Sequence, residues 1–239
     1  MQGKCISIED EVDFSAEISA YNTIAFCYPI YGSRVPLIMR EFATRHTEVL
    51  QGKKLIILVT QLIFSGDGAR VFTDMFPKNH FDIIYAEHFY MPNNVCNFPL
   101  LPRTSKKGTQ RCLRMVKIKL DRICKDINSG IVKLHGFSPF SQILGKVQGK
   151  SWQGDSASSV AIAGSMEAKA KSGVRIDVDC TVCGLCVATC PMKNLKVDDN
   201  KILHKNNCTM CYRCVNLCPH KAITVFFHKK PNWQYKGLY

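Results

Sequence analysis

Apolar runs alternate with polar turns along the first 144 residues of the chain. Three nearly continuous apolar runs cover residues 23–28, 54–60 and 81–90. Runs of this kind are typical of strands that are buried on both faces of a parallel sheet. A shorter run, residues 5–8, is expected to form a strand ahead of them. Together with the helical segments between them, these strands predict an α/β fold with a parallel sheet.

The helices expected between these strands differ in length and in what marks their ends. Pro36 precedes a helix over residues 37–46, since proline is tolerated in a first helical turn. A short helix is expected over residues 69–76. Residues 109–128 carry leucine, valine and isoleucine at alternating steps of three and four, which indicates one apolar face of an amphipathic helix. Gly130 is expected to cap that helix.

The pattern changes after residue 144. Residues 145–173 are rich in Gly, Ser, Ala and Lys and have weak periodicity, which predicts a flexible linker. Residues 174–239 contain an internal repeat with a period of 28 (208 minus 180), which predicts two copies of a strand, loop, short helix and strand. The chain is therefore expected to hold an α/β domain over 1–144, a linker, and a small α+β domain over 174–239.

Eight of the 13 cysteines follow one spacing that is written twice, C-x2-C-x2-C-x3-C-P. The first copy contains Cys180, Cys183, Cys186 and Cys190, and the second contains Cys208, Cys211, Cys214 and Cys218. In each copy a tight loop can turn three thiolates toward one cubane, and the fourth thiolate lies beyond a longer gap. This doubled spacing predicts two [4Fe–4S] clusters.

Two other cysteine chemistries fit the pattern less well. Zinc sites need only two C-x2-C pairs, whereas here triplets recur and each is followed by C-P. Disulfides are disfavoured because the N-terminus carries acids at positions 9, 10, 11 and 13, unlike a secretory signal. The longest apolar run, residues 55–64, is too short to span a bilayer. We therefore expect a cytoplasmic protein with no membrane partner.

Residues 174–239 resemble the bacterial two-cluster ferredoxin. In that family the fourth cysteine of each motif ligates the cluster of the other half. The resemblance implies that cluster one takes Cys180, Cys183, Cys186 and Cys218, and that cluster two takes Cys208, Cys211, Cys214 and Cys190. Arg213 stands in the second motif where the first has Leu185. A cation there predicts that cluster two is the easier to reduce.

The α/β part, placed ahead of such a domain, resembles the flavodoxin–ferredoxin fusion proteins of anaerobes. Three loops carry this resemblance: residues 28–36, from Tyr28-Pro29 to Val35-Pro36, residues 60–68, and Met91-Pro92-Asn93-Asn94. It implies a flavodoxin-like domain with a flavin bordered by Tyr28, Tyr31, Gly32, Thr60, Phe64 and Gly66. The aromatic members of that set would stack on the ring; ordinary aromatic packing at strand ends is the alternative.

The chain departs from the flavodoxin pattern at its start. Flavodoxins hold the FMN phosphate in a Ser/Thr/Gly-rich loop after the first strand, where backbone N–H groups attract the anion. That strand, loop and first helix have no counterpart here, and Asp67 would repel a phosphate. Either the sequence is a shortened reading of a longer protein, or the sheet closes the gap by direct strand pairing. We expect FMN to bind weakly or not at all.

Positive charge is concentrated in one stretch of this chain, whose formal net charge is +13. Residues 103–125 hold nine Lys or Arg against one acid, Asp121. A solvated helix face explains such a stretch, and so does a surface for an acidic redox partner. Nucleic-acid binding is a third interpretation that rests on the charge alone.

Two functional classes follow from these observations. In the first, the protein is a low-potential one-electron carrier whose N-terminal domain docks redox partners. In the second, it is an FMN-dependent reductase fed by the fused ferredoxin domain. The missing phosphate loop favours the carrier. The sequence also shows no acid–base constellation and no nucleophile motif, so we expect no catalytic residues.

Overall fold

The chain divides into two compact units, and neither is one continuous stretch. The computed structural model describes residues 3–32, 34–62, 66–98, 100–101, 103–153 and 165–237. Unit 1 comprises residues 1–91 and 110–162, and unit 2 comprises residues 92–109 and 163–239. The chain therefore passes between the units three times. This division differs from the predicted one, in which a single linker joins two successive domains.

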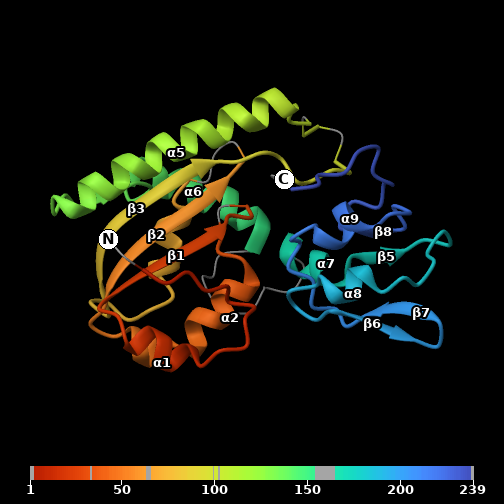
Figure 1. Ribbon diagram of the computed structural model, residues 1–239, viewed down its shortest axis with the longest axis horizontal. Helices are drawn as coiled ribbons and strands as arrows, with labels where there is room; N and C mark the ends of the chain where they lie inside the picture. The colour runs from red at the N-terminus through yellow and green to blue at the C-terminus, as the bar shows by residue number, and fades with distance from the viewer. Residues whose placement is uncertain are drawn as a thin grey trace. The chain divides into compact units, whose positions relative to one another are not determined.

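Unit 1 is built on a four-stranded parallel sheet (Figure 1). Its strands pair in the order β1 (Thr23–Pro29), β2 (Lys54–Gln61), β3 (Asp82–Tyr90) and β4 (Lys133–Leu134). Every pair is parallel. The sheet confirms the predicted parallel α/β architecture, and the three long strands lie where the apolar runs predicted them.

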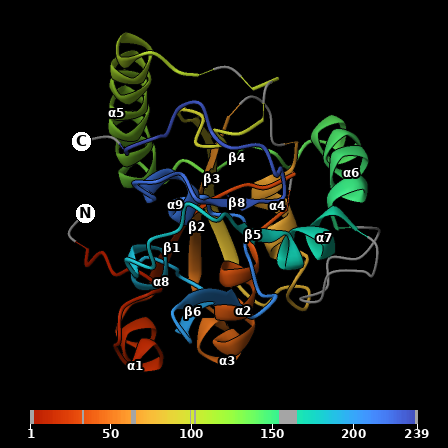
Figure 2. The same ribbon diagram turned by 90° about the vertical axis from the view of Figure 1, so that its right-hand side faces the viewer.

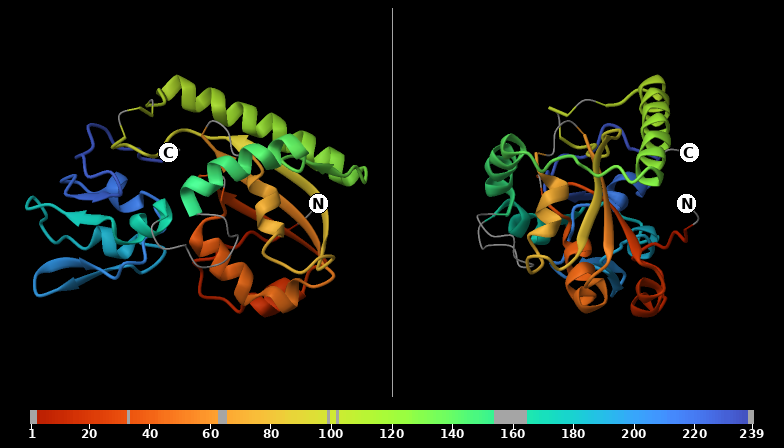
Figure 3. Two further views of the ribbon diagram at one scale, coloured as in Figure 1. Left: turned by 180° about the vertical axis from the view of Figure 1, so that it is seen from behind. Right: turned by 90° about the vertical axis from the view of Figure 1, so that its left-hand side faces the viewer.

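Helices cover both faces of this sheet (Figure 3). They are α1 (Phe14–Ser19), α2 (Leu37–Arg45), α3 (Thr47–Leu50), α4 (Gly68–Thr73), α5 (Lys106–Asn128) and α6 (Pro139–Gln153). On one face, Phe42 of α2 and Phe72 of α4 join the larger apolar core. On the other face, Ile123 of α5 packs with Tyr85 and Phe89 of β3.

Helix α5 begins three residues before the predicted start and ends where the amphipathic pattern ends. Gly130 has a φ of +70°, and its N–H donates to the Ile127 carbonyl at 3.0 Å. This left-handed glycine ends the helix as expected. No helix in the described part of the chain is long and apolar enough to cross a membrane.

Residues 5–8 form no strand, contrary to the prediction. The Ser7 N–H donates to the Asp10 carboxylate at 2.9 Å, and the Asp10 N–H donates to the Ser7 carbonyl at 2.9 Å. This turn uses backbone groups that a strand would need, a competition for which Ser and Asp are well suited. Among the described residues, β2 alone pairs with β1, so residues 5–8 do not close the sheet by direct pairing.

Part of the predicted linker is a helix packed against unit 1. Residues 145–153 lie in α6, whereas residues 154–164 fall outside the described ranges. Gly145 and Gly149 stand one turn apart on α6. A Cβ on Gly145 would lie 1.6 Å from Asp67 Oδ1, and one on Gly149 would lie 2.0 Å from Arg34 Cζ. These glycines allow a close approach, because any larger residue would collide there.

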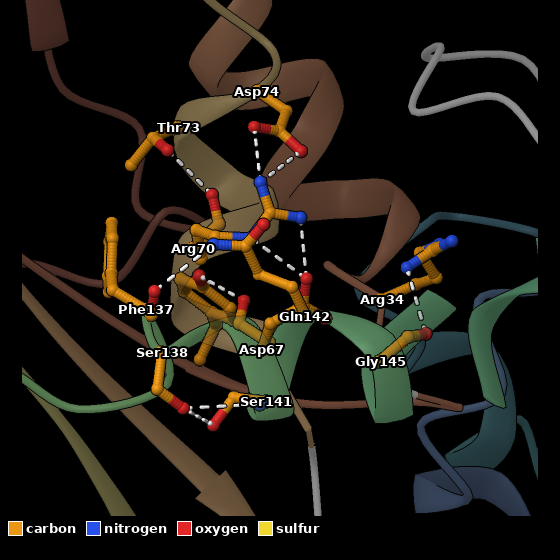
Figure 4. A network of polar contacts seen from close by, with 12 residues as sticks. Arg34, Asp67, Arg70, Thr73, Asp74, Phe137, Ser138, Ser141, Gln142 and Gly145 are labelled. Carbon is orange, nitrogen blue, oxygen red and sulfur yellow. Dashed lines mark hydrogen bonds and ion pairs between the residues drawn. The ribbon is translucent and has the colours of Figure 1, made fainter. Parts of the chain in front are cut away.

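Figure 4 shows a network of polar contacts that lies between α4 and α6. Arg34 Nη1 donates to the Gly145 carbonyl at 3.4 Å. Asp67 is fully buried and accepts from Arg70 Nε at 2.9 Å, and Arg70 also donates to Asp74 at 2.7 Å. Glycine content therefore misled the linker prediction, since here it serves packing rather than flexibility.

Unit 2 contains two copies of the predicted strand, loop, helix and strand (Figure 2). The first copy has β5 (Val174–Ile176), α8 (Leu185–Ala188) and β6 (Leu195–Asp198). The second has β7 (Lys201–His204), α9 (Arg213–Leu217) and β8 (Ile223–Val225). Strand β5 pairs with β8 and β6 with β7, both antiparallel. Helix α7 (Met166–Ser172) precedes the first copy, within the predicted linker.

Candidate iron–sulfur site

Two cavities in unit 2 are lined by the motif cysteines. The first, about 370 Å³ with its open mouth included, is lined by Cys180, Cys183, Cys186 and Cys218. The second, about 350 Å³, is lined by Cys208, Cys211, Cys214 and Cys190. Each cavity thus takes three cysteines from one motif and the fourth from the other. This is the crossed grouping that the ferredoxin resemblance implied.

The cysteines are not gathered as they would be around one ion. Within the described ranges, no three His, Cys, Asp or Glu side chains form a group that could hold a single metal ion. Four thiols spread around a cavity suit a larger inorganic group whose iron atoms each take one thiolate. The donor set is all sulfur, which is the ligand type of iron–sulfur clusters.

The two cysteine loops repeat their backbone turns as well as their spacing. Val182 and Met210 both have left-handed φ angles, 54° and 56°. Gly184 and Tyr212 also match, at 75° and 61°. Glycine adopts this conformation freely, whereas a bulky residue such as tyrosine is strained in it. The second loop therefore holds Tyr212 in a conformation that its neighbours must maintain.

Backbone N–H groups point at the fourth cysteine of each motif. The Asn194 N–H donates to Cys190 Sγ at 3.3 Å, and the Ala222 N–H donates to Cys218 Sγ at 3.3 Å. Such donors stabilise thiolate charge and are one of the means by which a protein tunes a cluster. Both halves provide this donor at the same place, four residues after the cysteine.

Burial raises the cysteine pKa values most in the second loop. Burial raises the pKa of Cys208 to about 12 and that of Cys214 well above its usual range. Burial also raises the pKa of Cys186 in the first loop. A cluster binds thiolates, so loading of these cysteines must release their protons and is opposed by low pH.

Protein covers the second loop more completely than the first. None of the four residues of α8 is buried, whereas α9 buries Val215 and Asn216. Tyr212 is 1% exposed and its hydroxyl donates to the Val225 carbonyl at 3.3 Å. In the first loop Cys183 is exposed.

A segment that lies far from the cysteines in the sequence contacts this site, and no local pattern predicted it. Residues 92–109, which follow β3, belong to unit 2. Asn94 Nδ2 donates to the Cys211 carbonyl at 3.3 Å, and Asn216 Nδ2 donates to the Asn94 carbonyl at 2.8 Å. Residues 91–94 carry part of the resemblance to the flavodoxin–ferredoxin fusion proteins, and Asn94 contacts the second cysteine loop. No local pattern could reveal a contact between residues 122 positions apart.

Three of the residues expected beside a flavin contact their own chain at the strand ends of unit 1. Tyr28 is 4% exposed, donates to the Gly68 carbonyl at 3.3 Å, and stacks on Phe72 with ring centroids 5.7 Å apart. Tyr31 exchanges backbone hydrogen bonds with Arg34. The Thr60 carbonyl accepts from the Ile30 N–H at 2.9 Å.

The two glycines of this set lie against α6. A Cβ on Gly32 would lie 2.6 Å from the Trp152 side chain, and one on Gly66 would lie 2.6 Å from the Gly145 Cα. Phe64 lies outside the described residues. A flavin at these loops would therefore compete with α6 for the surface that both glycines face.

One family model matches the chain. Residues 179–222 match the 4Fe-4S dicluster domain, and the matched range includes all eight motif cysteines. The match implies at least one [4Fe–4S] cluster and, with it, iron–sulfur electron transfer in unit 2. No curated protein and no solved structure matches the chain.

Proposed function

We propose that unit 2 holds two [4Fe–4S] clusters and that the protein is a low-potential one-electron carrier. The observation that carries this proposal is the pair of cavities with exchanged fourth cysteines. Cluster one would be held by Cys180, Cys183, Cys186 and Cys218, and cluster two by Cys208, Cys211, Cys214 and Cys190. When bound, each cluster supplies a centre that gains or loses one electron. The chain supplies the thiolates, the N–H donors and the shielding from water.

Unit 1 is proposed to dock redox partners through α5. This helix has eight Lys or Arg and two acids among its 23 residues. Lys117 and Lys119 are paired within the unit, at 2.9 Å to Asp121 and 3.0 Å to Glu87. Other cations, Arg114 among them, are exposed. Such a surface is complementary to an acidic redox protein and would steer its approach.

The alternative function, an FMN-dependent reductase, has less support. The Tyr28 side chain is buried in the core of unit 1, and Gly66 lies against α6, so neither is open to a flavin. Residues 1–22, which precede β1, contain no Ser/Thr/Gly-rich phosphate loop. Charge-assisted hydrogen bonds in such a loop contribute about 1.5–3 kcal/mol each. The loss of three would weaken FMN binding by on the order of a thousandfold or more.

Anaerobic purification followed by iron, sulfide and flavin analysis tests this proposal. We expect about eight irons per chain, two interacting paramagnetic centres after reduction, and FMN far below one per chain. About four irons would overturn the two-cluster assignment. One FMN per chain that is reduced by the clusters would favour the reductase over the carrier.

A further inference from the structure

A stretch from the middle of the chain contacts the cysteine loop of the cluster-two site. Residues 92–98, called here the cover segment, leave unit 1 after β3 and pack within unit 2. Asn94 Nδ2 donates to the carbonyl of Cys211, a cluster-two cysteine, at 3.3 Å. The Asn94 carbonyl in turn accepts from Asn216 Nδ2 at 2.8 Å. The cover segment is thus bonded both to the cysteine loop and to the helix that follows it.

Asn216 joins three separate stretches of chain at this point. It is 4% exposed, and its Nδ2 donates to the Tyr212 carbonyl at 3.1 Å as well as to Asn94. Its Oδ1 accepts from the Tyr235 N–H at 2.7 Å, and its carbonyl accepts from Lys236 Nζ at 2.9 Å. A buried amide whose donors and acceptor are satisfied holds its surroundings in one arrangement. Its loss would leave buried partners unpaired.

The cover segment has further anchors on either side of Asn94. Asn93 accepts from the Val95 N–H at 2.9 Å and donates to the Val95 carbonyl at 3.2 Å, which fixes a local turn. Asn97 donates to the Phe227 carbonyl. The Phe98 ring stacks on Phe227 with centroids 4.4 Å apart and planes 20° apart. Together these anchors hold the cover segment against the second cysteine loop and against the chain near Phe227.

The corresponding residues of the first cysteine loop are more exposed to solvent than those of the second. Ala188 stands where the second half has Asn216, and it has no side-chain amide to bond a cover. Cys183 and Ala188 are exposed, and Val178 is 98% exposed. The difference between the loops therefore comes from one residue in the repeat and from a segment far away in the sequence.

We infer that the cover segment, held by Asn94 and Asn216, makes cluster two more enclosed than cluster one and gives it the lower reduction potential. The inference rests on the proposed two-cluster function. One-electron reduction makes a cluster more negative, and a site shielded from water disfavours the additional charge. Cluster one, behind the exposed loop, then exchanges electrons with partners, and cluster two is the internal centre.

A redox titration of the full-length holoprotein, followed by electron paramagnetic resonance, tests this inference. Cys183→Ser and Cys211→Ser first assign the signals to cluster one and cluster two. In the unmodified protein we expect cluster two to be reduced at the lower potential. In Asn94→Ala, the ratio of reduced to oxidised cluster two at a fixed potential should rise about three- to tenfold, or about 30–60 mV for a one-electron couple. Cluster one should not shift.

Thr189→Ala is the matched control, because it removes a side-chain hydrogen bond to the Leu185 carbonyl (2.8 Å) in the first half. It should leave the potential of cluster two unchanged. Asn216→Ala should shift the potential of cluster two further than Asn94→Ala does. If Asn216→Ala loses iron, a second measurement on Asn94→Ala takes its place: the coupling of cluster two to deuterons in D₂O buffer, which should increase.

Unchanged potentials in Asn94→Ala, equal shifts of both clusters, or an unmodified cluster two that is reduced first would overturn the inference. Fewer than eight irons in the unmodified protein would instead overturn the proposed function.

Discussion

The two cysteine loops of unit 2 have the same spacing and the same left-handed turns, yet they differ in what surrounds them. In the first loop, Cys183 is exposed and α8 buries none of its residues. In the second, Thr209, Met210 and Tyr212 are each at most 8% exposed. The difference teaches that the motif determines which atoms can hold a cluster. The same spacing leaves open how deeply the residues between the cysteines are buried.

The largest expected effect comes from breaking the exchange of cysteines between the halves. Cys190→Ser should damage cluster two and spare cluster one, although Cys190 belongs to the first motif, because its sulfur lines the second cavity. Cys218→Ser should do the reverse. Iron analysis and electron paramagnetic resonance of both variants measure this. Loss of cluster one alone in Cys190→Ser would show that each motif serves its own cluster.

A second prediction concerns the left-handed position that the loops share. Tyr212→Gly removes a buried ring, at a cost of about 3–5 kcal/mol, and relieves backbone strain of roughly 1–3 kcal/mol. We expect a net loss of about 2 kcal/mol in the free energy of unfolding, with faster release of iron from cluster two to a chelator. Anaerobic denaturant titration measures the first quantity.

Two variants sharpen this second prediction. Tyr212→Phe keeps the ring and loses only the bond to the Val225 carbonyl, so it should cost about 1 kcal/mol. Gly184→Ala places a Cβ where nothing lies within 4 Å, so backbone strain of about 1–2 kcal/mol is its only cost. If Tyr212→Gly retained its iron as well as Gly184→Ala does, the second loop would be as open as the first.

The smallest expected effect belongs to Arg213. A cation about 7 Å from a cluster contributes roughly 2 kcal/mol at an effective dielectric near 20. Arg213 is exposed, so solvent and salt reduce this severalfold. Arg213→Gln should lower the potential of cluster two by no more than tens of millivolts, and less at high salt. A shift larger than that of Asn94→Ala would show that charge, rather than enclosure, governs cluster two.

Much of unit 2 could be predicted from local sequence because its ligands come from short, repeated loops. The spacing identified the eight cysteines, and the repeat gave the order of strand, loop, helix and strand. It could not identify the cover segment, because Asn94 and Asn216 are 122 residues apart and no local spacing links them. The expectation that Arg213 makes cluster two easier to reduce stays a prediction, and the proposed enclosure by the cover segment would act in the opposite direction.

In unit 1 the long elements were predictable and the packing was not. Apolar runs located β1, β2 and β3, and the steps of three and four located α5. Composition did not predict α6, because glycines such as Gly145 and Gly149 occur both in close helix contacts and in flexible linkers. The strand predicted over residues 5–8 does not form, because a local turn between Ser7 and Asp10 competes with strand pairing.

The distance along the chain between Asn94 and Asn216 has a consequence for how the protein is made. During synthesis the cover segment leaves the ribosome more than a hundred residues before its partner, so the two cannot meet until Asn216 has also been translated. Contacts of such long sequence separation also form slowly, since a large loop must close first. We therefore expect the contact between the cover segment and the second cysteine loop to form late in folding. Iron and sulfide could then reach that loop before the cover segment is in place.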